Sequence, residues 1–252
     1  MKRPGTSRFC WRLVPLSIYL IAVSKSSFTN PDADPPSLRR ADQLPQVLCP
    51  KTTRWNFASL DALNDVWANC ARISLRENLS GRQPRWGTEI RLGWSGDVLQ
   101  GLYLCQDPNP WATKTARDDA LWEEEVVEVF LDPFGDSLSY FEIEINPLNT
   151  VTDLCVRRTW TGLKMDFKWE CEGLVTACGT LAYGWMAAFQ IPFDSLGDCH
   201  PTHSPVWRVN FSRIDRPKDE PLELSAWSPT LVKSFHVPGR FGRLRFDQVE
   251  DP

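Results

Sequence analysis

The sequence lacks the features that mark several well-known classes of protein. Its 28 basic residues are scattered among 32 acidic ones, for a net charge of −4, so it has no basic stripe of the kind that neutralises phosphate. It also has no glycine-rich phosphate loop and no nucleophile elbow around a serine. We therefore expect no nucleic-acid partner, no nucleotide site and no serine hydrolase.

Cysteine is present but without a useful pattern. The eight cysteines are spread along the chain and no two are spaced as C-x-x-C, which argues against structural zinc. An evenly scattered set of this kind is not a disulfide framework. One pair, Cys171 and Cys178, could bridge in an oxidising compartment, and the rest are expected as small buried hydrophobes.

Long apolar runs are absent beyond the N-terminus. The apolar segment from Leu13 to Val23 follows several basic residues and ends in small ones, a pattern typical of a secretory signal over residues 1–24; a disordered tail is the alternative. The run is too short to span a bilayer, which takes about 20 residues. We expect a secreted or periplasmic protein with no membrane contact after cleavage; the pattern does not specify its oligomeric state.

Residues 25–48 are polar and proline-rich, which predicts a linker or arm, and we place one folded domain at 49–250. A short helix is expected over Ser59–Cys70. Beyond it the hydrophobic period changes to two, with a hairpin turning at Ser95-Gly96-Asp97 and further strands in LVTACGTLA, GWMAAFQIP, WRVNFSRID and GRLRF. This pattern predicts an all-β fold, an antiparallel two-sheet β-sandwich with a short N-terminal helix.

Two acidic runs, VVEVFLDP and SYFEIEINP, predict a second hairpin. Alternation places apolar residues on one side and the polar ones on a common open face: Glu128, Glu142, Glu144 and Asn146. Trp122 lies an even number of residues before Glu128 and could border that face. Carboxylates beside an indole suit sugar hydroxyls and the C–H face of a pyranose; the alternative is an ordinary solvated face.

Five segments in order resemble the family 9 carbohydrate-binding modules and their single-domain relatives in the DOMON-like superfamily. They are LWEEEVVEVFLDP, YFEIEINPLNTVTDL, WRVNFSRID, LSAWSP and FHVPGRFGRLRF, between about Cys49 and Phe246. The resemblance implies a β-sandwich in which two aromatic residues clamp a sugar and polar groups reach its hydroxyls. It further implies a non-catalytic role connected with polysaccharide breakdown. We expect no cofactor.

Carried onto this sequence, the resemblance places the clamp at Trp122 and Phe235, a hydrogen-bonding carboxylate at Glu128 and an amide at Asn210. Two positions depart from the family pattern. Phe235 stands where the family has tryptophan, and a basic residue of the central strand has become Glu142 or Glu144. The expected carbohydrate-binding set is therefore Trp122, Glu128, Glu142, Glu144, Asn210 and Phe235.

Other readings remain open. Some relatives use structural calcium, for which Asp132 and Asp136 could supply oxygens. A pair of the glutamates could instead serve a hydrolase acting on O-glycosyl bonds. The superfamily also includes haem binders, whose axial ligands would come from Met165, Met186, His200, His203 and His236. Arg213 could pair with Glu144 or present a donor to a ligand.

Overall fold

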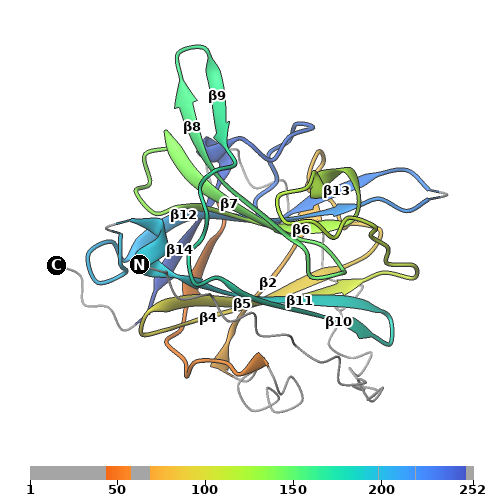
Figure 1. Cartoon of the computed structure of the whole chain (residues 1–252), viewed down its shortest axis with the longest axis horizontal. Helices are drawn as coiled ribbons and strands as arrows, with labels where there is room; N and C mark the ends of the chain where they lie inside the picture. Colours follow the sequence, from red (N-terminus) through yellow and green to blue (C-terminus); the bar gives the residue numbers. More distant parts are fainter. Residues whose placement is uncertain (1–43, 58–68, 198, 219, 248–252) are drawn as a thin grey trace, which may run out of the picture.

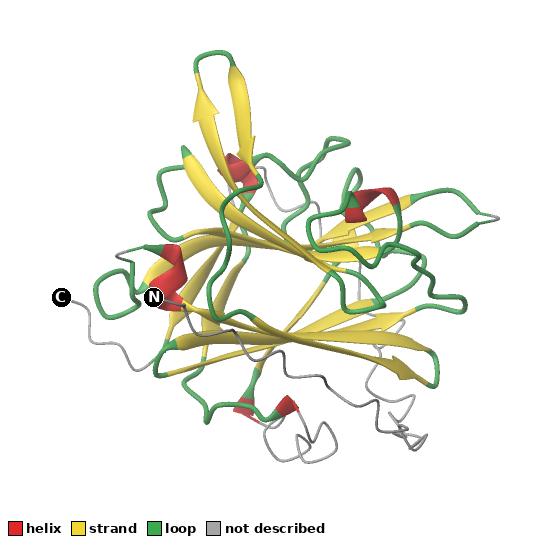
Figure 2. Ribbon diagram, in the orientation of Figure 1, coloured by secondary structure: helices red, strands yellow, loops and turns green. Residues whose placement is uncertain are grey.

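Two β-sheets packed face to face form the described part of the chain, which comprises residues 44–57, 69–197, 199–218 and 220–247 of this computed structural model. Figures 1 and 2 show the two layers of strands, with loops at their ends. The predicted β-sandwich is confirmed. The expected signal segment and residues 59–68 of the expected helix lie outside the described residues. No helix among the described residues is long and apolar enough to cross a membrane.

The larger sheet has nine strands, with the main order β1-β14-β12-β6-β7-β8-β9, while β13 pairs with both β12 and β3. All its pairings are antiparallel except the parallel pair of β1 and β14. Its strands are β1 (Gln46–Cys49), β3 (Arg76–Glu77), β6 (Val126–Asp132), β7 (Ser139–Ile145), β8 (Val151–Thr159), β9 (Gly162–Asp166), β12 (Val206–Asp215), β13 (Glu223–Ala226) and β14 (Gly242–Phe246).

The smaller sheet is antiparallel, with the order β10-β11-β5-β4-β2. Its strands are β2 (Ala71–Ser74), β4 (Thr88–Ser95), β5 (Val98–Gln106), β10 (Val175–Leu181) and β11 (Gly184–Pro192). Both expected hairpins are present, as β4–β5 and β6–β7. Short 3-10 helices lie in the connections: η4 (Leu121–Glu123) and η5 (Phe193–Leu196) between strands of different sheets, and η6 (Pro238–Arg240) between β13 and β14 of the larger sheet.

The sheet starts earlier than the sequence suggested. Gln46 to Leu48 fall within the range 25–48 predicted as a linker, yet they form most of β1. Val47 pairs with Leu244 of β14 and packs against the core. The proline-rich composition of this segment hid a strand that depends on a partner nearly 200 residues away.

The core between the sheets follows the predicted alternation. Val127, Val129 and Leu131 of β6 and Ile143 and Ile145 of β7 all belong to one buried cluster, which the smaller sheet closes from its side. Burying such side chains stabilises a fold by about 1.5–3 kcal/mol each. The faces of the acidic hairpin are therefore as predicted from the period of two.

We expected the opposite face of β6 and β7 to be open, but it is covered. A second apolar cluster covers it, built on Phe130 and Tyr140 and closed by Phe235 and Phe241 from the segment that leads into β14. Glu128, Glu142 and Glu144 are 2–3% exposed. The solvated-face alternative is thus wrong, because apolar side chains from a loop far along the chain pack onto this face.

The hairpin of β8 and β9 was not foreseen from the sequence. It extends beyond both layers, at the top of Figure 1. Every residue of β9 is exposed, so the strand has no buried face to produce an alternating pattern. This hairpin brings Met165 and Phe167 to the outer face of the larger sheet.

No disulfide joins any two of the seven cysteines within the described residues. Cys171 and Cys178, the pair considered for a bridge, have separate partners. Cys171 Sγ lies 3.2 Å from Ser195 Oγ, and Cys178 Sγ donates to the Asn146 carbonyl at 3.3 Å.

Candidate functional site

A cavity of about 450 Å³ lies on the outer face of the larger sheet. Its floor comes from β6 and β7, one side from η4 and the β9 region, and the other from residues 233–236. Five of the six expected site residues line it, namely Trp122, Glu128, Glu142, Glu144 and Phe235. The volume falls within the range of small-molecule sites.

Three glutamates form the floor of the cavity, and we call Glu128, Glu142 and Glu144 the floor glutamates. Glu128 pairs directly with Glu144 across β6 and β7, and Glu142 stands opposite Phe130 two positions along. One carboxylate oxygen from each lies within 4.8 Å of the others. Like charges placed opposite each other on a sheet repel. This spacing is one that a single cation could bridge.

Few protein groups satisfy these carboxylates. Ser212 Oγ donates to Glu128 Oε2 at 2.7 Å, and Glu144 accepts a backbone hydrogen bond from Trp122. Glu142 Oε2 and Glu144 Oε2 are buried without a hydrogen-bond partner. Buried polar atoms of native proteins normally have one, so these two oxygens mark the floor as a place for a ligand.

Burial also alters the acidity of the floor. It raises the pKa of Glu128 to about 7, against the lowering effect of the Ser212 hydrogen bond. Burial, then the charge of Glu128, raises the pKa of Glu142 well above its ordinary value. The pKa of Glu144 rises well above its ordinary value for the same reasons, with Glu142 adding to them. The cluster therefore holds protons in the absence of a bound cation.

Aromatic rings form the walls. Trp122, in η4, is 39% exposed, and its ring centroid lies 6.0 Å from that of Phe167, which is equally exposed. Phe235 lies deeper, 6% exposed, and packs against Phe130 with 6.2 Å between the centroids. Sequence reasoning missed Phe167, because the β8–β9 hairpin that precedes it was not predicted.

His236 stands beside the floor. Its Nδ1 lies 2.9 Å from the Tyr140 hydroxyl and 3.7 Å from Glu142 Oε2. Burial lowers the pKa of His236, so at neutral pH the ring is uncharged and provides no compensating cation for Glu142.

Asn210 lies outside the lining of the cavity. Its Nδ2 donates to the Ser228 carbonyl at 3.0 Å, and its Oδ1 accepts from the Ser228 backbone N–H at 2.9 Å. Asn210 is fully buried. The amide expected to bind sugar instead fastens the segment after β13 to the sheet, an arrangement that the spacing of residues along the chain does not reveal.

We predict that Asn210→Ala lowers the free energy of unfolding by about 2 kcal/mol, since it leaves two buried backbone groups of Ser228 without partners. Urea denaturation measures this change. Under conditions where the variant is fully folded, the affinity of the cavity for a ligand should stay within about twofold of the wild-type value, a change of under roughly 0.5 kcal/mol. A large loss of affinity with unchanged stability would return Asn210 to the binding set.

The residues considered for calcium hold a turn together. Asp132 accepts the backbone N–H groups of Gly135 and Ser137, at 2.7 and 2.9 Å. Asp136 Oδ1 accepts those of Leu138 and Ser139. These bonds explain both aspartates as turn residues, and calcium at this place stays a prediction.

The residues considered for haem are dispersed. Met165 and His236 line the outer cavity, whereas Met186 packs on the outside of the smaller sheet. His200 lies 3.1 Å from the Gly96 carbonyl through its Nε2, and its ring stands near that of His203. A cavity floored by three carboxylates is poorly matched to an apolar macrocycle, and haem binding stays an untested alternative.

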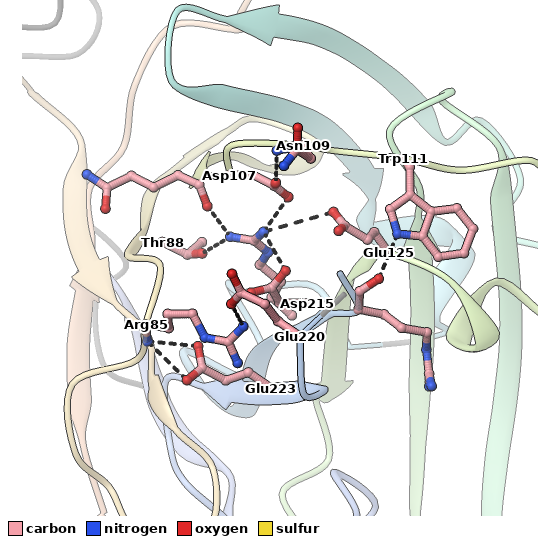
Figure 3. A network of polar contacts seen from close by, with 12 residues as sticks. Arg85, Thr88, Asp107, Asn109, Trp111, Glu125, Asp215, Glu220 and Glu223 are labelled. Atoms are coloured by element: carbon pink, nitrogen blue, oxygen red, sulfur yellow. Dashed lines mark hydrogen bonds and ion pairs between the residues drawn. The ribbon is translucent and has the colours of Figure 1, made fainter. Parts of the chain in front are cut away.

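A second acidic cluster surrounds Arg213, which sequence reasoning had placed near Glu144. On β12 the arginine faces the space between the sheets, and its Nη2 lies 2.7, 3.4 and 4.0 Å from carboxylate oxygens of Asp107, Asp215 and Glu125. Figure 3 shows the three carboxylates pointing toward one guanidinium group. Arg213 already occupies the cation position, so this cluster is a buried ion-pair network of the fold.

Glu125 is the least satisfied member of the Arg213 cluster. Neither of its carboxylate oxygens has a hydrogen bond. Burial, followed by the neighbouring Asp107, raises its pKa to about 9. Glu125 is therefore protonated at neutral pH, which leaves Asp107 and Asp215 as the nearer partners of the guanidinium group.

Comparison with known proteins supports the fold. No protein-family model and no curated protein matches the sequence. Among solved structures, a candidate carbohydrate-binding protein from Bacteroides uniformis matches with a TM-score of 0.67 and 17% identity, over 81% of this chain and all of that one.

Two structures of a family 9 carbohydrate-binding module from Caldicellulosiruptor kristjanssonii also match. One, in complex with cellotriose, has a TM-score of 0.59 and 14% identity over 82% of this chain and 98% of that one. The other, in complex with glucose, has a TM-score of 0.55 and 13% identity over the same shares. The chain shares its fold with carbohydrate-binding proteins, among them family 9 modules.

Proposed function

We propose that this protein is a secreted, non-catalytic carbohydrate-binding protein connected with polysaccharide breakdown. The observation that carries the proposal is the outer cavity, where aromatic rings stand over a floor of buried carboxylates. Ring faces cover the C–H surface of a pyranose, and carboxylates accept hydrogen bonds from its hydroxyls. The likeness in fold to proteins that hold cellotriose and glucose supports this reading.

Trp122 is the wall residue best placed to stack on a sugar ring, because its indole is partly exposed beside the floor. We predict that Trp122→Ala weakens binding to a soluble polysaccharide about thirtyfold, equivalent to roughly 2 kcal/mol for the loss of an aromatic contact. Affinity electrophoresis against a panel of soluble polysaccharides measures the effect.

Trp160→Ala is the matched control. Trp160 is fully exposed between β8 and β9 and lies outside the cavity lining, so its loss should leave the retardation of the protein in the gel unchanged. Equal retardation of wild type and Trp122→Ala on every polysaccharide that slows the protein would show that sugar binds elsewhere.

Hydrolysis of O-glycosyl bonds is the second candidate, favoured by the pKa of Glu128 near 7 and by the closeness of the carboxylates. Glycosidases place their two carboxyl groups on either side of the scissile bond. The floor glutamates instead project from adjacent strands of one sheet face and meet a ligand from the same side. If the purified protein releases reducing sugar from a polysaccharide and Glu128→Gln abolishes that release, hydrolysis would replace binding as the preferred function.

A further inference from the structure

The floor of the cavity gathers three carboxyl groups, and in the described part of the chain no arginine or lysine forms an ion pair with them. Within the described residues, the one ion-pair contact of the floor glutamates is His236, at 3.7 Å from Glu142, and that histidine is biased toward its neutral form. Arg216 and Lys233 also line the cavity, but no ion pair joins either of these described residues to a floor glutamate, and Arg216 Nη2 donates instead to the Trp122 carbonyl. The compensating charge must come from protons or from a ligand.

Two features of the site favour a positively charged organic ligand. Glu142 and Glu144 each present a buried oxygen without a hydrogen-bond partner, and an ammonium group donates up to three charge-assisted hydrogen bonds. The rings of Trp122, Phe167 and Phe235 surround the same cavity, and aromatic faces attract ammonium groups as well as C–H surfaces. A bare metal ion would use the carboxylates but gain little from the rings.

We propose that the ligand of this cavity is an amino sugar with a free ammonium group, received by Glu142 and Glu144 while the rings cover the pyranose. This inference rests on the proposed function and names its ligand class.

Three β-1,4-linked trisaccharides of the same length test the proposal, measured by isothermal titration calorimetry at pH 7 with EDTA present. They are the trimers of glucosamine, of glucose and of N-acetylglucosamine. We expect the glucosamine trimer to bind about ten- to a hundredfold more tightly than the other two, the range of a charge-assisted hydrogen bond.

Glu142→Gln and Glu144→Gln keep the shape and the accepting oxygen but remove the charge. The wild type should prefer the glucosamine trimer over the glucose trimer, and each substitution should reduce this preference about tenfold. Asp97→Asn removes one charge from the turn between β4 and β5, away from the cavity, and should leave the ratio unchanged. Circular dichroism confirms that each variant is folded.

The outcomes separate the two proposals. Equal or tighter binding of the glucose trimer overturns the amino-sugar inference and leaves carbohydrate binding intact. Binding that appears only when Ca²⁺ replaces EDTA overturns it in favour of a metal ion on the floor. If none of the three trimers binds and no polysaccharide retards the protein, carbohydrate binding itself fails.

Discussion

Replacing Glu142 and Glu144 together by glutamine is expected to raise the free energy of unfolding at pH 8 by about 2 to 4 kcal/mol. Both carboxyl groups are buried beside Glu128, and burial and mutual repulsion raise their pKa values. Glutamine keeps the size of the side chain and removes the charge. For Glu128, a rise to about pKa 7 alone corresponds to roughly 3 kcal/mol at high pH.

The effect depends on pH in a defined direction. Because the folded-state pKa values lie above those of the unfolded chain, the folded protein binds more protons, and stability falls as pH rises from about 4.5 through 7 and beyond. The wild type should therefore be more stable at pH 5 than at pH 8. Glu128 on β6 and His236 also have shifted pKa values, Tyr140 on β7 contacts His236, and Arg216 and Lys233 line the same cavity.

Urea denaturation at pH 5 and pH 8 measures both quantities. The double variant should show a weaker dependence on pH than the wild type, with the two proteins converging at pH 5. Other buried carboxyl groups contribute equally to both proteins and cancel. Glu172→Gln, at an exposed position outside the cavity lining, serves as the charge control. A double variant that is less stable at pH 8 would show that the floor carboxylates are compensated in the folded protein.

This result would also bear on function. Buried like charges that cost stability are retained where a ligand uses them, since binding sites commonly trade stability for activity. The amino-sugar proposal requires two results together. Replacing the floor glutamates by glutamine must stabilise the fold, and it must remove the preference of the cavity for a cationic sugar.

Arg213→Met is expected to lower the free energy of unfolding by about 3 to 5 kcal/mol, the cost of removing one partner from a buried ion pair. The arginine is 1% exposed, and its Nη1 also donates to the Gln106 carbonyl at 2.7 Å. Without it, Asp107 and Asp215 lose the arginine that is their ion-pair partner among the described residues. Urea denaturation at pH 7 measures the loss.

Two further variants test whether the loss of stability in Arg213→Met comes from the unpaired aspartates. Arg213→Met combined with Asp107→Asn should recover part of the stability, because Asp107 is the carboxylate nearest to the guanidinium group. Adding Glu125→Gln to Arg213→Met should recover little, because Glu125 is already protonated at pH 7. Arg54→Met is the control: Arg54 and Asp97 form an exposed pair, and such pairs contribute at most about 1 kcal/mol. An Arg213→Met loss no larger than that control would contradict the network.

The sequence by itself determined the fold class, the two hairpins and the faces of their strands. A period of two fixes which side chains share a face, so the alternation alone was enough to group Glu128, Glu142 and Glu144. The order of motifs then placed Trp122 and Phe235 with them, and all five line one cavity.

Only the tertiary structure decided what covers each face. The period of two is the same whether a face meets solvent, a loop or a second sheet, so it did not reveal that Phe235 and Phe241 pack onto this face or that its glutamates are buried. Nor did it show that Arg213 points between the sheets while Asn210 holds Ser228. The exposed strand β9, which has no apolar face, left no signal at all. Burial and charge balance arise from contacts between distant segments, and for this reason the chemistry of the cavity became apparent only in three dimensions.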